Sequence, residues 1–191
     1  MAPGVSSSLV ESVDLYPTVA SVAGLPPPPD LDGTDLTPII RDPTAEVSKA
    51  AYSEYPRCPP TLSEPWSDTT SCVHTKRADF AVMGYSVRTV GWRYTAWLHW
   101  DSANLKGDFS RPLVGEELYP HAGDVGASMD AFENVNLAND ATHAAVQAEM
   151  FALAVAHWNV TRAFRGLPAA PVPAQPENAD MHRLQFEIWD Q

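Results

Sequence analysis

The sequence predicts an α+β fold: a small antiparallel sheet of three to four strands with a C-terminal helix packed on it. Apolar and polar residues alternate from Trp92 to Trp100, which is typical of a strand with one buried face. Residues 140–158 are rich in Ala, Leu and Met at helical spacing. A second helical pattern lies near the N-terminus, before a Pro-rich linker, and we expect it to pack outside the sheet.

The composition of the chain argues against some kinds of partner. The chain has 191 residues, of which 45% are hydrophobic, enough for a core, and its formal net charge is −12. The 12 Lys and Arg residues form no cluster, which argues against a nucleic-acid partner. No apolar run approaches the roughly 20 residues of a membrane span. We therefore expect neither nucleic acid nor membrane as a partner.

The N-terminal helix is expected to begin at Asp14 as its cap, with Pro17 in the first turn and Gly24 as its stop. The run "PPPP" at 26–29 is expected to be a stiff linker. A strand is expected from Ala50, and residues 56–78 are expected to form a loop.

The stretch 80–100 predicts a hairpin that turns at Gly91. Another strand is expected at 115–121, and the helix at 140–158 is expected to be capped by Asn139 or Asp140. From Thr161 onward the Pro-rich spacing indicates a mobile tail, in which "LQFEIW" is a further strand candidate. We divide the chain into 1–45, 46–160 and 161–191.

Two cysteines, Cys58 and Cys72, lie in the predicted loop. A long irregular loop gains most from a covalent link, so we favour a disulfide over two free thiols. The sequence "NVT" makes Asn159 a glycosylation candidate. Both features favour a secretory, lysosomal or periplasmic-type compartment, provided that the full-length protein has a signal peptide. The start "MAPGVSSS" lacks the features of one.

The sequence shows no catalytic residue and no metal site. It contains no G-x-S-x-G, and the serine of "MGYS" lies within a strand. The six histidines form no pair with metal-ligand spacing. We expect these histidines to be exposed or packed in the core.

Five blocks in order resemble the C-terminal part of a type I sulfatase, of the alkaline phosphatase superfamily. They are "LVESVDLYPTVASVAGL", "LDGTDLTPII", "MGYSVRTVGWRYTAWLHW", "GEELYPHAGD" and "ENVNLAND". "YSEYPR" and "MGYSVRT" are most similar to the iduronate-2-sulfatase branch. The stretch "VGASMDAF" resembles an insertion. The likeness implies that residues 1–45 are the end of an α/β catalytic core and that 46–160 form the C-terminal subdomain.

The resemblance implies that the full-length family uses calcium and a formylglycine made from the cysteine of a C-x-P-S-R motif. Both lie upstream of the segment resembled here. "CPPTL" at Cys58 lacks the arginine, so we do not interpret Cys58 as the nucleophile. The chain alone is expected to be inactive, without cofactor, and to need the missing N-terminal catalytic core as its partner.

Arg88, Arg93 and Trp97 are the substrate-cleft candidates, because guanidinium groups bind sulfate and carboxylate bidentately and aromatic rings stack on sugars. A simple hairpin register is expected to place Arg88 and Arg93 on opposite faces of the sheet. The structural alternatives are an ion pair with the core for each arginine and packing against the core for Trp97.

Three functions are compatible with these observations. The first is a fragment of a sulfuric ester hydrolase that acts on sulfated sugars such as glycosaminoglycans. The second is a non-catalytic sulfated-glycan-binding or assembly module, against which the net charge of −12 argues. The third is a phosphatase or phosphonate hydrolase of the same superfamily, whose pattern lacks "MGYSVRT".

Overall fold

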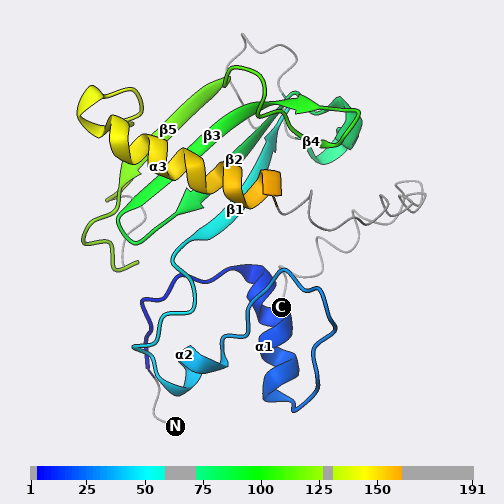
Figure 1. Ribbon diagram of the computed structural model, residues 1–191, viewed down its shortest axis with the longest axis vertical. Helices are drawn as coiled ribbons and strands as arrows, with labels where there is room; N and C mark the ends of the chain where they lie inside the picture. The colour runs from blue at the N-terminus through cyan, green and yellow to red at the C-terminus, as the bar shows by residue number, and fades with distance from the viewer. Residues whose placement is uncertain (1–3, 59–71, 127–130, 161–191) are drawn as a thin grey trace, which may run out of the picture.

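The computed structural model describes residues 4–58, 72–126 and 131–160, the last two residues by backbone alone. Figure 1 shows an upper unit, a sheet crossed by one helix, and a lower unit of two short helices. The elements are α1 (Leu15–Val22), α2 (Thr37–Arg41), β1 (Ala51–Arg57), β2 (Val82–Arg88), β3 (Trp92–Asp101), β4 (Lys106–Gly107), β5 (Gly115–Pro120) and α3 (Ala144–Val155). The predicted α+β class is confirmed.

All strand pairings are antiparallel, and the long strands lie in the order β1-β2-β3-β5. The two-residue β4 pairs only with the far end of β3. Between β2 and β3 the chain turns at Val90 and Gly91, where Thr89 N–H donates to the carbonyl oxygen of Trp92 at 2.8 Å. The predicted hairpin and its turn are therefore confirmed.

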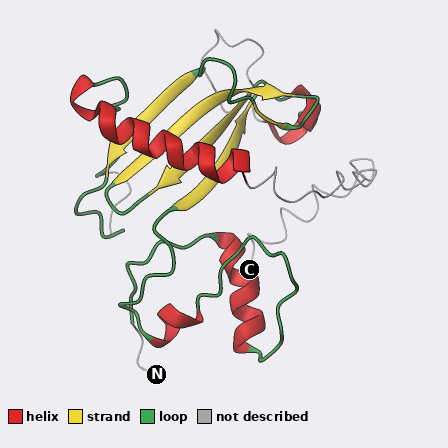
Figure 2. Cartoon of the chain, in the orientation of Figure 1, coloured by secondary structure: helices red, strands yellow, loops and turns green. Residues whose placement is uncertain are grey.

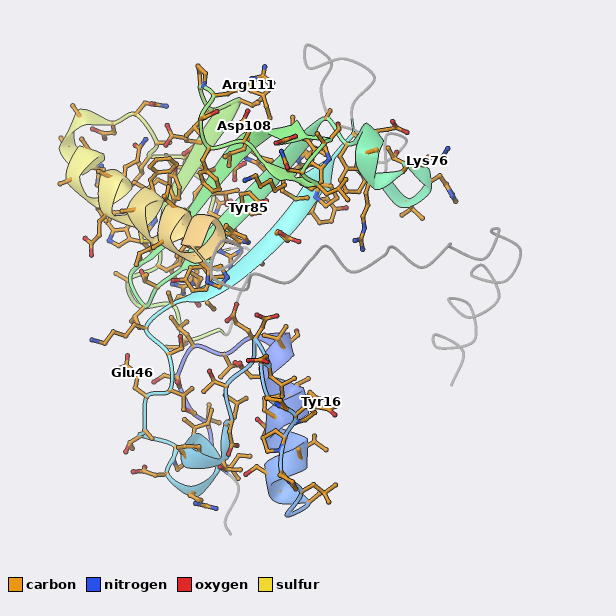
Figure 3. All side chains as sticks on the ribbon, turned by 45° about the vertical axis from the view of Figure 1, so that its right-hand side comes forward. Tyr16, Glu46, Lys76, Tyr85, Asp108 and Arg111 are labelled. Carbon is orange, nitrogen blue, oxygen red and sulfur yellow. A yellow bond between two sulfur atoms is a disulfide. The ribbon has the colours of Figure 1, made fainter. Side chains whose placement is uncertain are left out.

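The core lies between α3 and one face of the sheet, as Figure 2 shows for the helix and the strands beneath it. Tyr85 belongs to this core, beneath α3 in Figure 3. The helix contributes Met150 and Ala154. The side chains with no exposed surface are Val87, Tyr94, Ala96, Leu98, Leu118 and Ala154. The predicted alternation in β3 is confirmed, because its even-numbered residues point toward the helix.

The lower unit is organised around the buried carboxylate of Asp14. This carboxylate accepts from the N–H of Glu11 at 2.8 Å and from the N–H of Thr34 at 2.7 Å, so it joins the start of α1 to the chain before α2. Asp14 does stand at the N-cap position of α1, but its side chain makes no capping bond to that helix. Pro17 lies in the first turn, and Gly24 follows the helix with φ of +68°, both as expected.

Helix α3 is preceded by a 3-10 turn, Ala141–His143, that Asp140 caps by accepting from the N–H of Thr142 at 2.9 Å. The helix continues into a wider turn, Ala156–Val160. The strand candidate "LQFEIW", the tail from 161 and the side chain of Asn159 lie outside the described residues. Within the described part of the chain, no helix combines the length and the apolar character needed to cross a membrane.

Strand β1 forms one edge of the sheet. The N–H of Tyr52 points outward and donates to Glu11 Oε1 at 2.7 Å, which ties the edge to the lower unit. Pro56 lies four residues further along the strand, so its nitrogen also points outward. Because proline has no N–H, this edge offers few free donors.

Strand β5 forms the opposite edge. Here the N–H of Leu118 donates to Asn136 Oδ1 at 3.0 Å, and the N–H of Leu137 donates to the carbonyl oxygen of Leu118 at 2.9 Å. Asn136 Nδ2 also donates to the carbonyl oxygen of Glu116 at 3.0 Å. The segment before α3 therefore covers this edge.

Candidate functional site

The structure places Arg88, Arg93 and Trp97 on one face of the sheet, opposite α3. Arg88 and Arg93 are direct cross-strand partners, and side chains of such partners point the same way. The expectation that a simple register separates them is wrong, because the two-residue turn puts them opposite each other. We call this side the polar face, and its side chains include Arg57, Ser86, Arg88, Arg93, Thr95, Trp97, Glu117 and Tyr119.

Arg88 is held closely by its surroundings. Its Nη2 lies 3.1 Å from Asp124 Oδ2, and its Nη1 donates to the carbonyl oxygens of Thr89 and Val90. Only 18% of the side chain is exposed. Burial lowers the pKa of Arg88, and the nearby Asp124 charge opposes that shift. The polar groups of Arg88 are thus largely occupied within this chain.

Arg93 is more open. Its Nε lies 2.9 Å from Glu133 Oε1, but the N–H is not directed at that oxygen, so the contact is an ion pair without a hydrogen bond. The side chain is 41% exposed. Two arginines directly opposite each other repel. The carboxylates of Asp124 and Glu133 offset this repulsion.

His121 lies between these two carboxylates. Its Nδ1 is 2.8 Å from Asp124 Oδ2, its Nε2 is 2.9 Å from Glu133 Oε1, and its side chain is only 4% exposed. The Phe132 ring is stacked on it, with centroids 5.3 Å apart. The pKa of Asp124 is lowered first by the N–H of Gly126 and then by His121. We call Arg88, Arg93, His121, Asp124 and Glu133 the charge cluster.

Trp97 is fixed on the polar face by several contacts. Its ring covers Gly84, its cross-strand partner, and the guanidinium of Arg57 lies 4.6 Å from the ring centroid. Its Nε1 donates to Glu117 Oε1 at 2.7 Å, and the other oxygen of Glu117 accepts from the Tyr119 hydroxyl at 3.3 Å. A sugar that stacks on Trp97 would have to share the ring with Arg57.

Cys58 and Cys72 form a disulfide, with their Cα atoms 5.4 Å apart. Cys58 directly follows Arg57, the last residue of β1. The bridge thus lies next to the Arg57–Trp97 contact. A cysteine in a disulfide has no thiol to convert into formylglycine.

The described residues do not fit a catalytic metal. Among them, no group of three or more His, Cys, Asp or Glu side chains is placed to hold an ion. In the charge cluster the two carboxylates lie on opposite nitrogens of the His121 ring, so they do not converge on one point. No step that depends on calcium or formylglycine follows from these residues.

A cavity of about 460 Å³ lies between the segment before β5 and the first half of α3. Apolar side chains such as Phe109, Leu113 and Phe151 line much of it. None of the three substrate-cleft candidates contributes to its wall. The cavity therefore belongs to the helix side of the sheet.

Sequence reasoning missed Arg57 and the three residues that complete the charge cluster. The sequence pattern predicts only that His121 is exposed or packed in the core, and the stretch before Glu133 resembles an insertion. A usable signal was present, since His121 and Asp124 follow a strand at a spacing of three. No sequence pattern predicts that Glu133 contacts His121.

No protein-family model matches the chain. Comparison with curated proteins does find relatives. The chain is 30% identical to iduronate 2-sulfatase of Mus musculus over 158 residues, which cover 72% of this chain and 26% of that protein. It is 32% identical to iduronate 2-sulfatase of Homo sapiens over 161 residues, with coverage of 73% and 27%. It is also 42% identical to human arylsulfatase A over 60 residues.

A solved structure agrees with these relatives. A sulfatase from Bacteroides thetaiotaomicron VPI-5482 aligns with a TM-score of 0.50 and 25% identity, over 84% of this chain and 27% of that one. The chain spans about a quarter of the length of the iduronate 2-sulfatases that it matches. This chain is therefore related to the sulfatases, and it resembles the C-terminal portion of a protein such as iduronate 2-sulfatase.

Proposed function

We propose that this chain is the C-terminal part of a sulfuric ester hydrolase that removes sulfate from sulfated sugars such as glycosaminoglycans. One observation carries the proposal: the likeness to iduronate 2-sulfatase extends over 72–73% of the chain at 30–32% identity. The nucleophile and the metal then belong to a catalytic core outside this chain. The residues described here would shape and support the cleft.

The exposed surface of α1 supports the proposal that a further part of the protein packs on this chain. Four of its apolar side chains are more than half exposed, namely Leu15, Tyr16, Val19 and Val22. Tyr16 projects from α1 at a distance from the sheet in Figure 3. A soluble domain rarely leaves so many apolar side chains of one short helix uncovered. We propose that the catalytic core covers them.

On the polar face the three candidates have different roles in this proposal. Arg93 has the more exposed side chain, so it is the candidate to face the anionic substrate. The polar groups of Arg88 are largely occupied by Asp124 and by backbone carbonyls, so it supports the wall. Trp97 bounds the wall together with Arg57.

A secretory-type compartment fits the proposal. The Cys58–Cys72 disulfide is of the kind that persists in oxidising compartments. Glycosylation of Asn159 would be a further sign of this route. Mass spectrometry of the protein from its native source, before and after glycosidase treatment, tests that residue.

We expect opposite results for the isolated chain and for a chimera that supplies a catalytic core. The isolated chain should show no turnover of an aryl sulfate or of iduronate 2-sulfate. A chimera in which this chain replaces the matching segment of human iduronate 2-sulfatase should fold and retain sulfatase activity. Arg93→Ala in the chimera should raise KM more than it lowers kcat, because it removes a binding contact.

Turnover by the isolated chain that disappears in Cys58→Ser would overturn the assignment of the chemistry to another segment. A folded chimera without activity would contradict the role as a sulfatase part. A full transcript with a stop codon just before Met1 would do the same.

The alternative of a free-standing sulfated-glycan-binding module is favoured only by the arginines and Trp97 on one face. Its net charge of −12 opposes polyanion binding. Isothermal titration with a sulfated disaccharide separates the two proposals. We expect no measurable binding by the isolated chain.

A further inference from the structure

Arg93 has a carboxylate beside it but makes no hydrogen bond to it. Its Nε lies 2.9 Å from Glu133 Oε1, and the N–H at that nitrogen is not directed at the oxygen. Among the residues that the structure describes, none accepts a hydrogen bond from this side chain. A guanidinium carries five N–H donors in a planar fork. The charge of Arg93 is therefore partly neutralised while its hydrogen-bonding capacity stays unused.

Glu133 is a weak partner for Arg93. The oxygen that approaches Arg93 also lies 2.9 Å from Nε2 of His121, so one atom is shared between two neighbours. The side chain of Glu133 is 34% exposed, and water screens ion pairs that are this open. Its backbone has a φ of +64°, which residues other than glycine rarely adopt, so the carboxylate is held there at a conformational cost.

The two arginine–carboxylate pairs of the charge cluster differ in kind. Arg88 donates a hydrogen bond to Asp124 at 3.1 Å, whereas Glu133 only lies close to Arg93. The two positive and two negative charges of these pairs cancel, so they attract an anion little over a distance. An anion that reaches the polar face thus meets one cation with unused donors, Arg93, and a carboxylate beside it that repels the anion.

We propose that Glu133 sets the specificity of the polar face by competing with anions for Arg93. This inference rests on the proposed function, in which Arg93 faces an anionic sugar. A sulfate ester or a carboxylate displaces Glu133, because two of its oxygens can accept parallel hydrogen bonds from one guanidinium. A spherical anion such as chloride cannot form this bidentate pair and does not displace Glu133. The group selected is therefore an oxyanion of the sugar.

The first test measures KM in the chimera with human iduronate 2-sulfatase. Glu133→Gln should lower KM for the sulfated substrate by about 2- to 5-fold, the size expected for loss of a partly exposed ion pair, and leave kcat unchanged. Glu149→Gln is the matched control, because it removes the same charge from an exposed position on α3, on the other face of the sheet, and its KM should not change. Combined with Arg93→Ala, Glu133→Gln should have no effect on KM, a coupling that a merely structural role would not produce.

The second test uses the isolated chain and needs no catalytic core. The NMR signal of the Arg93 Nε–H is followed while sodium sulfate or sodium chloride is added at equal ionic strength, since NMR detects binding too weak for calorimetry. The signal of the wild type should respond to sulfate and not to chloride. In Glu133→Gln it should respond to both anions, and to sulfate at lower concentration. If Glu133→Gln does not fold, Glu133→Asn replaces it in both tests, because asparagine adopts positive φ more readily.

The two tests separate this inference from the proposed function. An active chimera whose KM is the same with and without Glu133 would overturn the inference alone. A folded chimera without activity would contradict the proposed function. In that case the titrations decide the inference, and equal responses of the wild type and Glu133→Gln to both anions would overturn it.

Discussion

Gly84 lies beneath the six-membered ring of Trp97, and a Cβ atom built on it would be 2.5 Å from Cζ3 of that ring. The ring has little freedom to retreat, because Nε1 is bonded to Glu117 at 2.7 Å. We expect Gly84→Ala to lower the free energy of unfolding by about 1–3 kcal/mol, as overpacking does elsewhere. Urea unfolding followed by tryptophan fluorescence measures the loss.

Gly91 provides the control for this substitution. No atom lies within 4 Å of a Cβ built there, and its φ is not positive. Gly91→Ala should change the free energy of unfolding by no more than about 0.5 kcal/mol. If the two variants are equally stable, the ring of Trp97 does not depend on a glycine beneath it.

At the scale of the elements, α1 is the helix that the fold leaves uncovered. Val19 and Val22 are 66% and 69% exposed and lie one turn apart. We expect the isolated chain to self-associate through this surface. The double variant Val19→Glu with Val22→Lys should shift sedimentation velocity toward the monomer, with stability within about 0.5 kcal/mol of the wild type.

Val90 offers a matched control, because it is 67% exposed but lies in the hairpin turn. Val90→Glu places a charge at a similarly exposed valine outside α1, so the association should persist in it. Equal association of both variants and the wild type would show that α1 is not the contact surface.

For the whole molecule, the Cys58–Cys72 bridge is the covalent constraint between β1 and the chain that leads to β2. The two residues are 14 positions apart. Closing a loop of about 15 residues contributes roughly 3 kcal/mol in the chain-entropy model. We expect the double variant Cys58→Ser with Cys72→Ser to lose this amount in urea unfolding, and a reducing agent to have no further effect on it. A variant with the wild-type midpoint would assign the bridge no role in stability.

Much of the fold was predictable from local patterns. Alternation in β3, the turn at Gly91 and the composition of α3 depend on near neighbours in the chain, and each is confirmed. The pairing of Arg88 with Arg93 was missed, because a register follows from the turn geometry and not from the alternation. The position of Asp14 was predicted but its partners were not, since Thr34 reaches it from a separate segment.

The candidate site was predictable only in part, for the same reason. The three cleft candidates could be named because arginine and tryptophan in one strand pair indicate binding of an anionic sugar. The environment of His121 depends on two carboxylates that lie 3 and 12 residues further along the chain. No local pattern predicts that meeting.

The two edges of the sheet have one more consequence. A strand from another molecule adds to a sheet only where it finds a row of free donors and acceptors. On β1, Glu11 occupies one outward N–H and Pro56 lacks another, while Asn136 and Leu137 occupy β5. We therefore expect both edges to add a further strand less readily than a fully open edge would. Self-association of the isolated chain should remain reversible on dilution. The associated species should not bind dyes specific for cross-β structure.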